Sequence, residues 1–149
     1  PQLDFYAESQ AKVGIALAEA QINCWKIKYR ELVDRPTRYI RDVLGHTGWT
    51  STIGIHPHPE FPSGHSQTGG AFAGAMTSIF GSSYPVTVHT YDHLGKPSRS
   101  YASFSDMADS ISMSRVYGGI HYKYTCQESK KQGWKIADNI VSIVKFQKE

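Results

Sequence analysis

Residues 61–66 of this 149-residue chain, Phe-Pro-Ser-Gly-His-Ser, combine groups that could bind an anion and move a proton. Pro62 fixes the backbone before a turn and Ser63 is a favourable helix N-cap, so the first backbone N–H groups of the following helix would be free to bind a ligand. Such a helix end favours anions, and Gly64 lets them approach because it lacks a Cβ. His65 can accept or donate a proton near neutral pH. Taken alone, the motif also fits a capped core helix with a satisfied histidine.

Four residues elsewhere carry charged or proton-transfer groups that the packing of helices and loops does not require: Lys28, Arg35, Arg115 and His121. Together with the Ser-Gly-His stretch, they would suit a tetrahedral or trigonal-bipyramidal oxyanion. The three cations would neutralise its equatorial oxygens, the arginines through planar forks. One histidine would be the apical nucleophile or ligand, and the other would act on the opposite apical oxygen.

Three segments of the chain occur in the order shared by a known superfamily. They are Lys28-Tyr-Arg-Glu-Leu-Val-Asp-Arg35-Pro36, Pro62-Ser-Gly-His65 and Ser114-Arg115-Val-Tyr-Gly-Gly-Ile-His121. Together they resemble the signature of the superfamily of vanadium-dependent haloperoxidases and type 2 phosphatidic acid phosphatases, over residues 25–121. The resemblance implies an all-helical bundle. It also implies that residues 1–149 are the C-terminal, site-bearing half of a longer haloperoxidase chain.

In the haloperoxidase branch, the resemblance implies vanadate as the cofactor, with hydrogen peroxide and a halide as substrates. His121 would bind vanadium axially, and the other vanadate oxygens would be held by Lys28, Arg35, Ser63, Gly64 and Arg115. His65 would take a proton from hydrogen peroxide, so that His65, His121 and Lys28 form the catalytic set. Vanadium would act as a Lewis acid that polarises the peroxide for attack by halide, which releases hypohalous acid. Organic halogen acceptors would be further partners.

The phosphatase branch is the alternative, a soluble acid phosphatase in which His121 attacks phosphorus to form a phosphohistidine and His65 protonates the leaving alcohol. Two offsets favour the haloperoxidase. Trp25 lies three residues before Lys28 and His58 lies seven before His65, and both resemble positions that line the halide side of haloperoxidase pockets. A histidine at position 58 points to iodide or bromide rather than chloride, unless it is a loop residue without a substrate role.

The third segment departs from the family pattern at Thr125, where an aspartate usually follows the histidine by four residues. Without that carboxylate, His121 would be less firmly oriented, unless a backbone carbonyl or the Thr125 hydroxyl accepts its second N–H. A phosphatase nucleophile should suffer more from this loss than a metal ligand, so the substitution favours vanadate binding. It also leaves open a degenerate family member that only binds phosphate or is structural.

The composition fits one soluble globular domain. Apolar residues make up 40% and charged residues 19% of the chain, and no apolar run is long enough to span a membrane. The net charge of +3 comes from dispersed basic residues, which argues against nucleic acid as a partner and fits a small anionic ligand. Cys24 and Cys126 could form a disulfide or remain buried thiols. The family resemblance implies a secreted or periplasmic protein, because hypohalous acid is best made outside the cytoplasm.

The elements that must position these residues are mostly helices. Apolar spacing without internal proline predicts a long helix over residues 3–29, with Trp25 and Lys28 on one face. Alternating residues followed by turn-forming residues predict a small hairpin within residues 81–100. Further helices are expected over residues 37–44, over residues 64–80, from a cap at Ser103 or Ser105 to about residue 117, and over residues 126–146. The predicted fold class is therefore all-α, a single helical-bundle domain with a long irregular active-site loop.

That loop, residues 45–62, has no hydrophobic period and contains three glycines and three prolines. Loops of this length often line or cover a functional site. His56 and His58 lie in it and, together with His65 and His121, could suggest zinc. No cysteine or carboxylate joins them at ligand spacing, so the sequence disfavours a zinc site.

Overall fold

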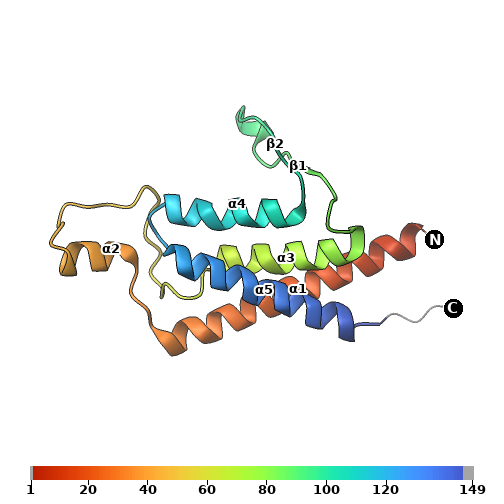
Figure 1. Ribbon diagram of the computed structural model, residues 1–149, viewed down its shortest axis with the longest axis horizontal. Coiled ribbons are helices and arrows are strands. Elements are labelled where there is room, and N and C mark those ends of the chain that lie inside the picture. Colours follow the sequence, from red (N-terminus) through yellow and green to blue (C-terminus); the bar gives the residue numbers. More distant parts are fainter. Residues whose placement is uncertain (1, 146–149) are drawn as a thin grey trace.

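The computed structural model describes residues 2–145. Within this part of the chain, four long helices form the bundle: α1 (Gln2–Glu31), α3 (Gly64–Phe80), α4 (Phe104–Tyr117) and α5 (Lys123–Ile143). Figure 1 shows them side by side, with α3 packed against α1, α4 and α5. The helical turn α2 (Pro36–Arg38) continues into the π-helical turn η1 (Tyr39–Val43) at one end of the bundle. None of the helices over residues 2–145 combines the length and apolar character needed to cross a membrane.

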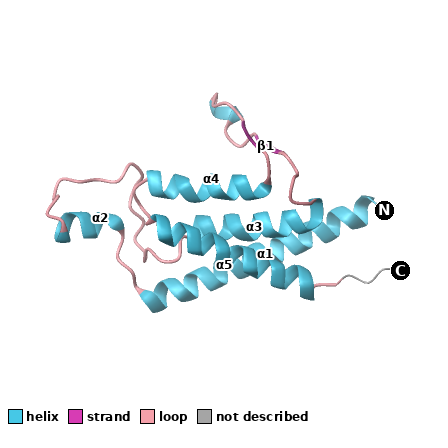
Figure 2. Cartoon of the chain, in the orientation of Figure 1, coloured by secondary structure: helices cyan, strands magenta, loops and turns pink. Residues whose placement is uncertain are grey.

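A small antiparallel hairpin connects α3 to α4 and projects from an otherwise helical fold (Figure 2). Its strands are β1 (Val86–Val88) and β2 (Arg99–Tyr101), with the 3-10 turn η2 (Asp92–Leu94) between them. Gly95 ends that turn with φ 67°, in the left-handed region that glycine enters most readily. The predicted all-α bundle with a small hairpin is confirmed, although the second strand extends one residue past the predicted range.

Two serines cap the helices that follow them. Ser63 is the N-cap of α3, and its hydroxyl accepts a hydrogen bond from the Ser66 N–H at 3.4 Å. Ser103, and not Ser105, caps α4 by accepting from the Asp106 N–H at 3.1 Å. The predicted start of α3 is thus confirmed, and the choice left open for α4 is resolved.

The largest differences from the predicted boundaries are at α2 and α5. The helix predicted over residues 37–44 is divided between α2 and the wider turn η1. α5 begins at Lys123, three residues earlier than predicted, because the chain leaves its extended conformation directly after Tyr122. It ends at Ile143, and the predicted end at Phe146 lies outside the described residues.

Glycines allow α3 and α5 to pack very close together. A Cβ at Gly70 would collide with the backbone oxygen of Lys130, and a Cβ at Gly133 would collide with the backbone oxygen of Gln67. The two glycines therefore permit an approach of two backbones that any side chain would prevent. The small residues of α3 predicted such a close neighbour, and α5 is that neighbour.

Cys24 of α1 and Cys126 of α5 are both buried and both free. Of the two alternatives that the sequence left open, the structure has separate thiols. Burial raises the pKa of both thiols, which disfavours the reactive thiolate.

One end of the bundle brings together the segments with the predicted site residues. The last turns of α1, the start of α3, the end of α4 and the start of α5 all lie there, and residues 45–62 run across this end (Figure 1). The Glu60 N–H donates to the Val33 carbonyl at 2.8 Å, and the Ile53 N–H donates to the Gly118 carbonyl at 3.3 Å. These bonds fix the loop to the chain after α1 and to the end of α4.

Candidate active site

A cavity of about 670 Å³ lies between α1, α3 and α4 and reaches the end of the bundle where these segments meet. We call it the site cavity. Most of the predicted site residues line it: Trp25, Lys28, His58, Gly64, His65 and His121. The other three, Arg35, Ser63 and Arg115, are not part of its lining.

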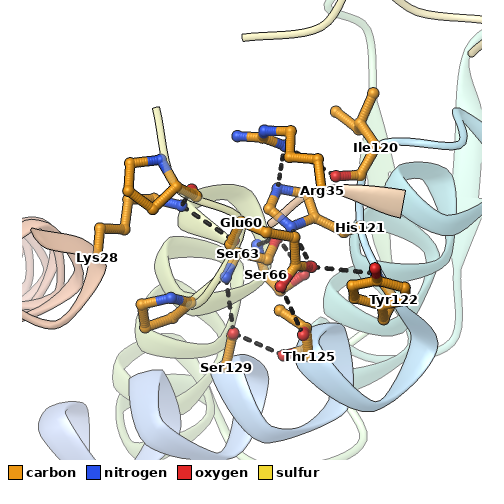
Figure 3. A network of polar contacts seen from close by, with 12 residues as sticks. Lys28, Arg35, Glu60, Ser63, Ser66, Ile120, His121, Tyr122, Thr125 and Ser129 are labelled. Atoms are coloured by element: carbon orange, nitrogen blue, oxygen red, sulfur yellow. Dashed lines mark hydrogen bonds and ion pairs between the residues drawn. The ribbon is translucent and has the colours of Figure 1, made fainter. Parts of the chain in front are cut away.

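His121 lies in the turn between α4 and α5 and is only 5% exposed. Its Nδ1 is 2.8 Å from a carboxylate oxygen of Glu60 (Figure 3). Because a carboxylate accepts, Nδ1 carries the ring proton and Nε2 presents a lone pair. Nε2 lies 3.4 Å from Nη1 of Arg35, so the lone pair faces a cation. Burial, the largest effect, lowers the pKa of His121, which favours the neutral ring.

Glu60 is fully buried and is the residue at this site that the motif analysis missed. One of its oxygens also accepts from the Tyr122 N–H at 3.0 Å, and the other accepts from the Thr125 hydroxyl at 2.9 Å. The Nδ1–H of His121 therefore donates to a carboxylate. Glu60 of the loop supplies this carboxylate in place of the aspartate that the family pattern has at position 125. Thr125 donates to that carboxylate and makes no bond of its own to the histidine ring.

The sequence held one signal for this role. Glu60 is the only acidic residue between Asp42 and Asp92, and it lies two residues before Pro62 of the Ser-Gly-His motif. A lone carboxylate beside a motif of polar residues is a candidate for burial in a hydrogen-bond network. The pattern of the superfamily places the carboxylate four residues after the histidine, where this chain has Thr125.

Lys28 extends from α1 into the bundle and is 1% exposed. Its ammonium group donates to the carbonyl oxygens of Pro59 at 2.7 Å and Glu60 at 3.1 Å. Burial lowers the pKa of Lys28 to about 8, so the side chain is mainly protonated at neutral pH. The predicted pairing with Trp25 on one helix face is confirmed, because both side chains line the site cavity.

Arg35 follows α1 in an extended conformation and is 5% exposed. Its guanidinium donates to the carbonyl oxygens of His58 at 3.1 Å and Ile120 at 2.8 Å. The side chain therefore joins the active-site loop to the turn that carries His121 (Figure 3). Nη1 of Arg35 also lies 3.4 Å from Nε2 of His121. Within the described residues, no hydrogen bond brings another cation to that nitrogen.

Ser63 and His65 occupy the start of α3 in different surroundings. Ser63 is fully buried, and its hydroxyl accepts from both the N–H and the hydroxyl of Ser66. The Ser63 N–H donates to the Ser129 hydroxyl at 2.9 Å, which ties the helix start to α5. His65 instead faces open space and lines two cavities. Partial burial lowers its pKa, and the nearby charge of Arg115 lowers it further.

Arg115 contacts a different part of the site from Lys28, Arg35 and His121. Its Nε donates to the Ser114 hydroxyl at 3.1 Å, and its side chain lines a second cavity that it shares with His65. No hydrogen bond within residues 2–145 joins it to Lys28 or His121. The structure thus brings Arg115 to His65 and leaves it apart from the cluster around His121.

Trp25 and His58 form an aromatic wall beside Lys28. Their ring centroids are 5.0 Å apart in an edge-on arrangement, and His56 stacks on His58 with centroids 5.6 Å apart. The two histidines of the loop therefore pack on each other. Over residues 2–145, no group of three or more histidine, cysteine or acidic side chains could hold a metal ion such as zinc.

The charge at the site is suited to an anion. Within residues 2–145, none of Lys28, Arg35 and Arg115 forms a salt bridge to a carboxylate. The Glu60 carboxylate is instead bonded to His121, the Tyr122 N–H and the Thr125 hydroxyl. Cations that are bonded to carbonyl and hydroxyl oxygens but paired with no carboxylate, next to an imidazole lone pair, form a donor set that would fit an oxyanion such as vanadate.

Comparisons with known proteins identify the family and the fold of this chain. The family model of the VCPO second helical-bundle domain matches residues 44–148. A bacterial vanadium-dependent iodoperoxidase structure is 34% identical with a TM-score of 0.85, covering 92% of this chain and 33% of that one. The apo and holo structures of bacterial vanadium-dependent chloroperoxidase are 22% identical, with TM-scores of 0.75 and 0.73. They cover 90% and 88% of this chain and 35% and 34% of theirs, and they show a shared fold.

No curated protein matches the chain. The chain spans about a third of the length of the solved structures that it resembles. The family model, in contrast, covers well over half of this chain. The chain therefore belongs to the vanadium haloperoxidase family, in which it corresponds to the second helical-bundle domain.

Proposed function

We propose that this chain carries the vanadate site of a haloperoxidase that oxidises iodide or bromide with hydrogen peroxide to hypohalous acid. The observation that supports this most directly is the Nε2 lone pair of His121, held in place by Glu60 and facing the cation of Arg35. When bound, vanadate would supply a Lewis acid that makes hydrogen peroxide reactive toward halide. The remaining chemistry falls to the side chains around it.

The protein's own groups would divide into a ligand and a cationic cradle. His121 would bind vanadium through Nε2, and the vanadate oxygens would be held by Lys28 and Arg35, with Gly64 offering a backbone N–H at the helix start. Arg115 would reach the cradle from the side of His65. Ser63 is fully buried, does not line the site cavity and bonds to the Cys126 thiol, so it would contribute only by turning its hydroxyl proton toward the cavity.

His65 would act as the proton acceptor for hydrogen peroxide. A base for this step must be neutral at the working pH, and partial burial together with Arg115 lowers the pKa of His65 toward that state. The residue also lies at the junction of two cavities, so a proton taken at the site can pass to solvent.

Trp25 and His58 would line the side from which halide enters. The two rings are in edge-on contact, and both line the site cavity together with Lys28. A large polarisable halide suits such an aromatic wall. One similar structure, at 34% identity, is described as an iodoperoxidase, which fits the iodide part of this proposal.

A soluble acid phosphatase is the second candidate, and one observation favours it. The sequence argument against it was the missing carboxylate behind His121, and Glu60 supplies that carboxylate at 2.8 Å. An oriented imidazole whose Nε2 carries the lone pair is also what a phosphohistidine mechanism needs. The same donor set would hold phosphate as readily as vanadate.

Vanadate separates the two candidates, because it should activate a haloperoxidase and inhibit a phosphatase as a transition-state mimic. The experiment follows iodide and bromide oxidation by hydrogen peroxide, and hydrolysis of p-nitrophenyl phosphate, each titrated with orthovanadate. Halide oxidation that requires vanadate and is lost in His121→Ala supports the haloperoxidase. Phosphate hydrolysis that vanadate abolishes, without halide oxidation, would make the protein a phosphatase.

The experiment is best done on the longest natural chain that contains these residues. We infer from the length of the matched structures that another helical bundle accompanies this domain and completes the walls of the site cavity. We also propose export from the cytoplasm, because hypohalous acid damages cytoplasmic components.

A further inference from the structure

A second cavity, of about 610 Å³, lies between the β1–β2 hairpin and α4. We call it the hairpin cavity. It shares three lining residues, His65, Met107 and Ile111, with the site cavity. The two cavities are therefore neighbours, with His65 at the boundary between them. A molecule in the hairpin cavity would lie next to the proposed proton acceptor.

The lining of the hairpin cavity is positively charged. Lys96 and Arg99 from the hairpin and Arg115 from α4 contribute to it, and no aspartate or glutamate does. Within residues 2–145, none of the three forms a salt bridge to a carboxylate, whereas Lys130 is paired with Asp109. Three cations without anionic partners around one cavity favour an anionic ligand.

Aromatic rings accompany these charges. Tyr91 and Tyr101 line the cavity, and the Tyr101 hydroxyl lies 3.3 Å from the Ser110 hydroxyl. The ammonium of Lys96 lies 5.8 Å from the centre of the Tyr91 ring. Tyrosine rings offer stacking surfaces to a planar ligand, and their hydroxyls offer hydrogen bonds.

The size of the cavity indicates an organic ligand. Pockets for small organic molecules range from about 300 to 1,000 Å³, and 610 Å³ falls within this range. A halide or vanadate ion would fill only a small part of it. The positive charge, the tyrosine rings and the volume together match an aromatic molecule that carries a carboxylate or phenolate.

We propose that the hairpin cavity binds an aromatic organic anion, of the hydroxybenzoate class, as the halogen acceptor. The binding part of this proposal stands on the cavity alone, and the acceptor role rests on the proposed function. In that role, hypohalous acid from the site cavity reacts at a ring carbon. A carbon–halogen bond forms, the oxygen–halogen bond breaks, and the ring proton leaves with the hydroxide as water.

Binding is tested first, without vanadate, peroxide or halide. Calorimetric titration compares 4-hydroxybenzoate with the neutral 4-hydroxybenzyl alcohol, on the unmodified protein and on a Lys96→Ala/Arg99→Ala variant. The matched control is Lys131→Ala/Lys135→Ala, which removes two exposed charges from α5, away from this cavity. We expect the carboxylate to bind at least tenfold more tightly than the alcohol. We also expect a tenfold or greater loss in the hairpin variant and less than a twofold change in the control.

Three results would overturn the binding site: no saturable binding of 4-hydroxybenzoate, equal binding of the alcohol, or unchanged binding in the hairpin variant. Displacement by equimolar inorganic phosphate would also overturn it, because the cavity would then be a general anion site.

The acceptor role is tested by comparing two products in the loaded protein, triiodide and ring-iodinated 4-hydroxybenzoate. The hairpin variant should raise the KM for the acceptor about tenfold and leave triiodide formation unchanged. Equal ring iodination by both proteins would overturn the acceptor role. If no halide is oxidised by either protein, the proposed function fails while the measured binding still decides the cavity.

Discussion

Nδ1 of His121 and the Glu60 carboxylate lie 2.8 Å apart, although 61 residues separate them in the chain. Both side chains are almost completely buried, and the carboxylate accepts two more hydrogen bonds, from the Tyr122 N–H and the Thr125 hydroxyl. A buried carboxylate with three donors is fixed in position, and it fixes the imidazole in turn. The orientation of the Nε2 lone pair thus depends on a residue of the active-site loop.

Replacing Glu60 with glutamine is expected to weaken vanadate binding by about 10-fold to 100-fold. The amide can donate to Nδ1 as well as accept from it, so the ring is no longer held in one tautomer. Vanadate affinity is measured by calorimetry, and circular dichroism confirms that the variant is folded. Thr125→Ser, which keeps the hydroxyl bonded to Glu60, is the matched control. Unaltered affinity in a folded Glu60→Gln protein would show that this carboxylate does not orient the ligand.

The two histidines of the proposed site should separate binding from turnover. His121→Ala removes the proposed ligand, and vanadate binding should fall below detection. His65→Ala removes the proposed base, which should lower kcat for halide oxidation by about 10²-fold to 10⁴-fold while vanadate binding changes only a few-fold. Vanadate titration and steady-state kinetics on both variants check this. A loss of binding in His65→Ala that equals the loss in His121→Ala would contradict the assigned roles.

The parts of this site that could be predicted from the sequence are those specified by residues close together in the chain. Ser63 as a cap and Trp25 beside Lys28 follow from neighbours within one helical turn, and the structure confirms both arrangements. The contact of Glu60 with His121 depends on the path of a long loop, so the isolated position of Glu60 in the sequence indicates the residue but not its partner. The position of Arg115 between two cavities depends likewise on where the hairpin lies over α4.

The helix boundaries show the same limit. Ser63 and Gly81 define the ends of α3, and the predicted range was correct. The start of α5 has no capping side chain, because Tyr122 precedes it, and the prediction was three residues late. Helix ends that depend on a cap are therefore readable from the sequence, and ends set by tertiary packing are not.

Anion binding should weaken as the pH rises through about 8. Burial lowers the pKa of Lys28 to about 8, so the side chain is charged below this pH and neutral above it. A neutral amine no longer attracts an oxyanion, so the affinity for vanadate should fall from pH 7 to pH 9. Lys28→Gln has no such group, and its pH profile reports the ionisation of vanadate alone. Identical profiles for the two proteins would mean that Lys28 does not titrate in this range.

The same shift makes an opposite prediction for stability without an anion. The folded-state pKa of Lys28 is lower than its unfolded value of about 10.5, so the unfolded chain binds more protons between pH 8 and pH 10.5. The contribution of Lys28 to the free energy of unfolding should therefore increase as the pH rises through this range. Urea unfolding at several pH values, compared with Lys28→Gln, measures it. A difference between the two proteins that stays constant with pH would contradict it.

Two alanine substitutions at glycines should change stability in opposite directions. Gly70→Ala places a Cβ against the backbone oxygen of Lys130, so α3 and α5 must move apart, at a cost of about 1–3 kcal/mol or more. Gly14→Ala meets no atom within 4 Å and lies in the middle of α1. It should stabilise the protein by roughly 0.5–1 kcal/mol, because alanine favours the helix. Urea unfolding followed by circular dichroism compares the two variants with the unmodified protein.

Because α3 begins at the Ser-Gly-His motif, Gly70→Ala should also weaken vanadate binding, whereas Gly14→Ala should not. If both variants unfold like the unmodified protein, the close contact between α3 and α5 does not govern its stability.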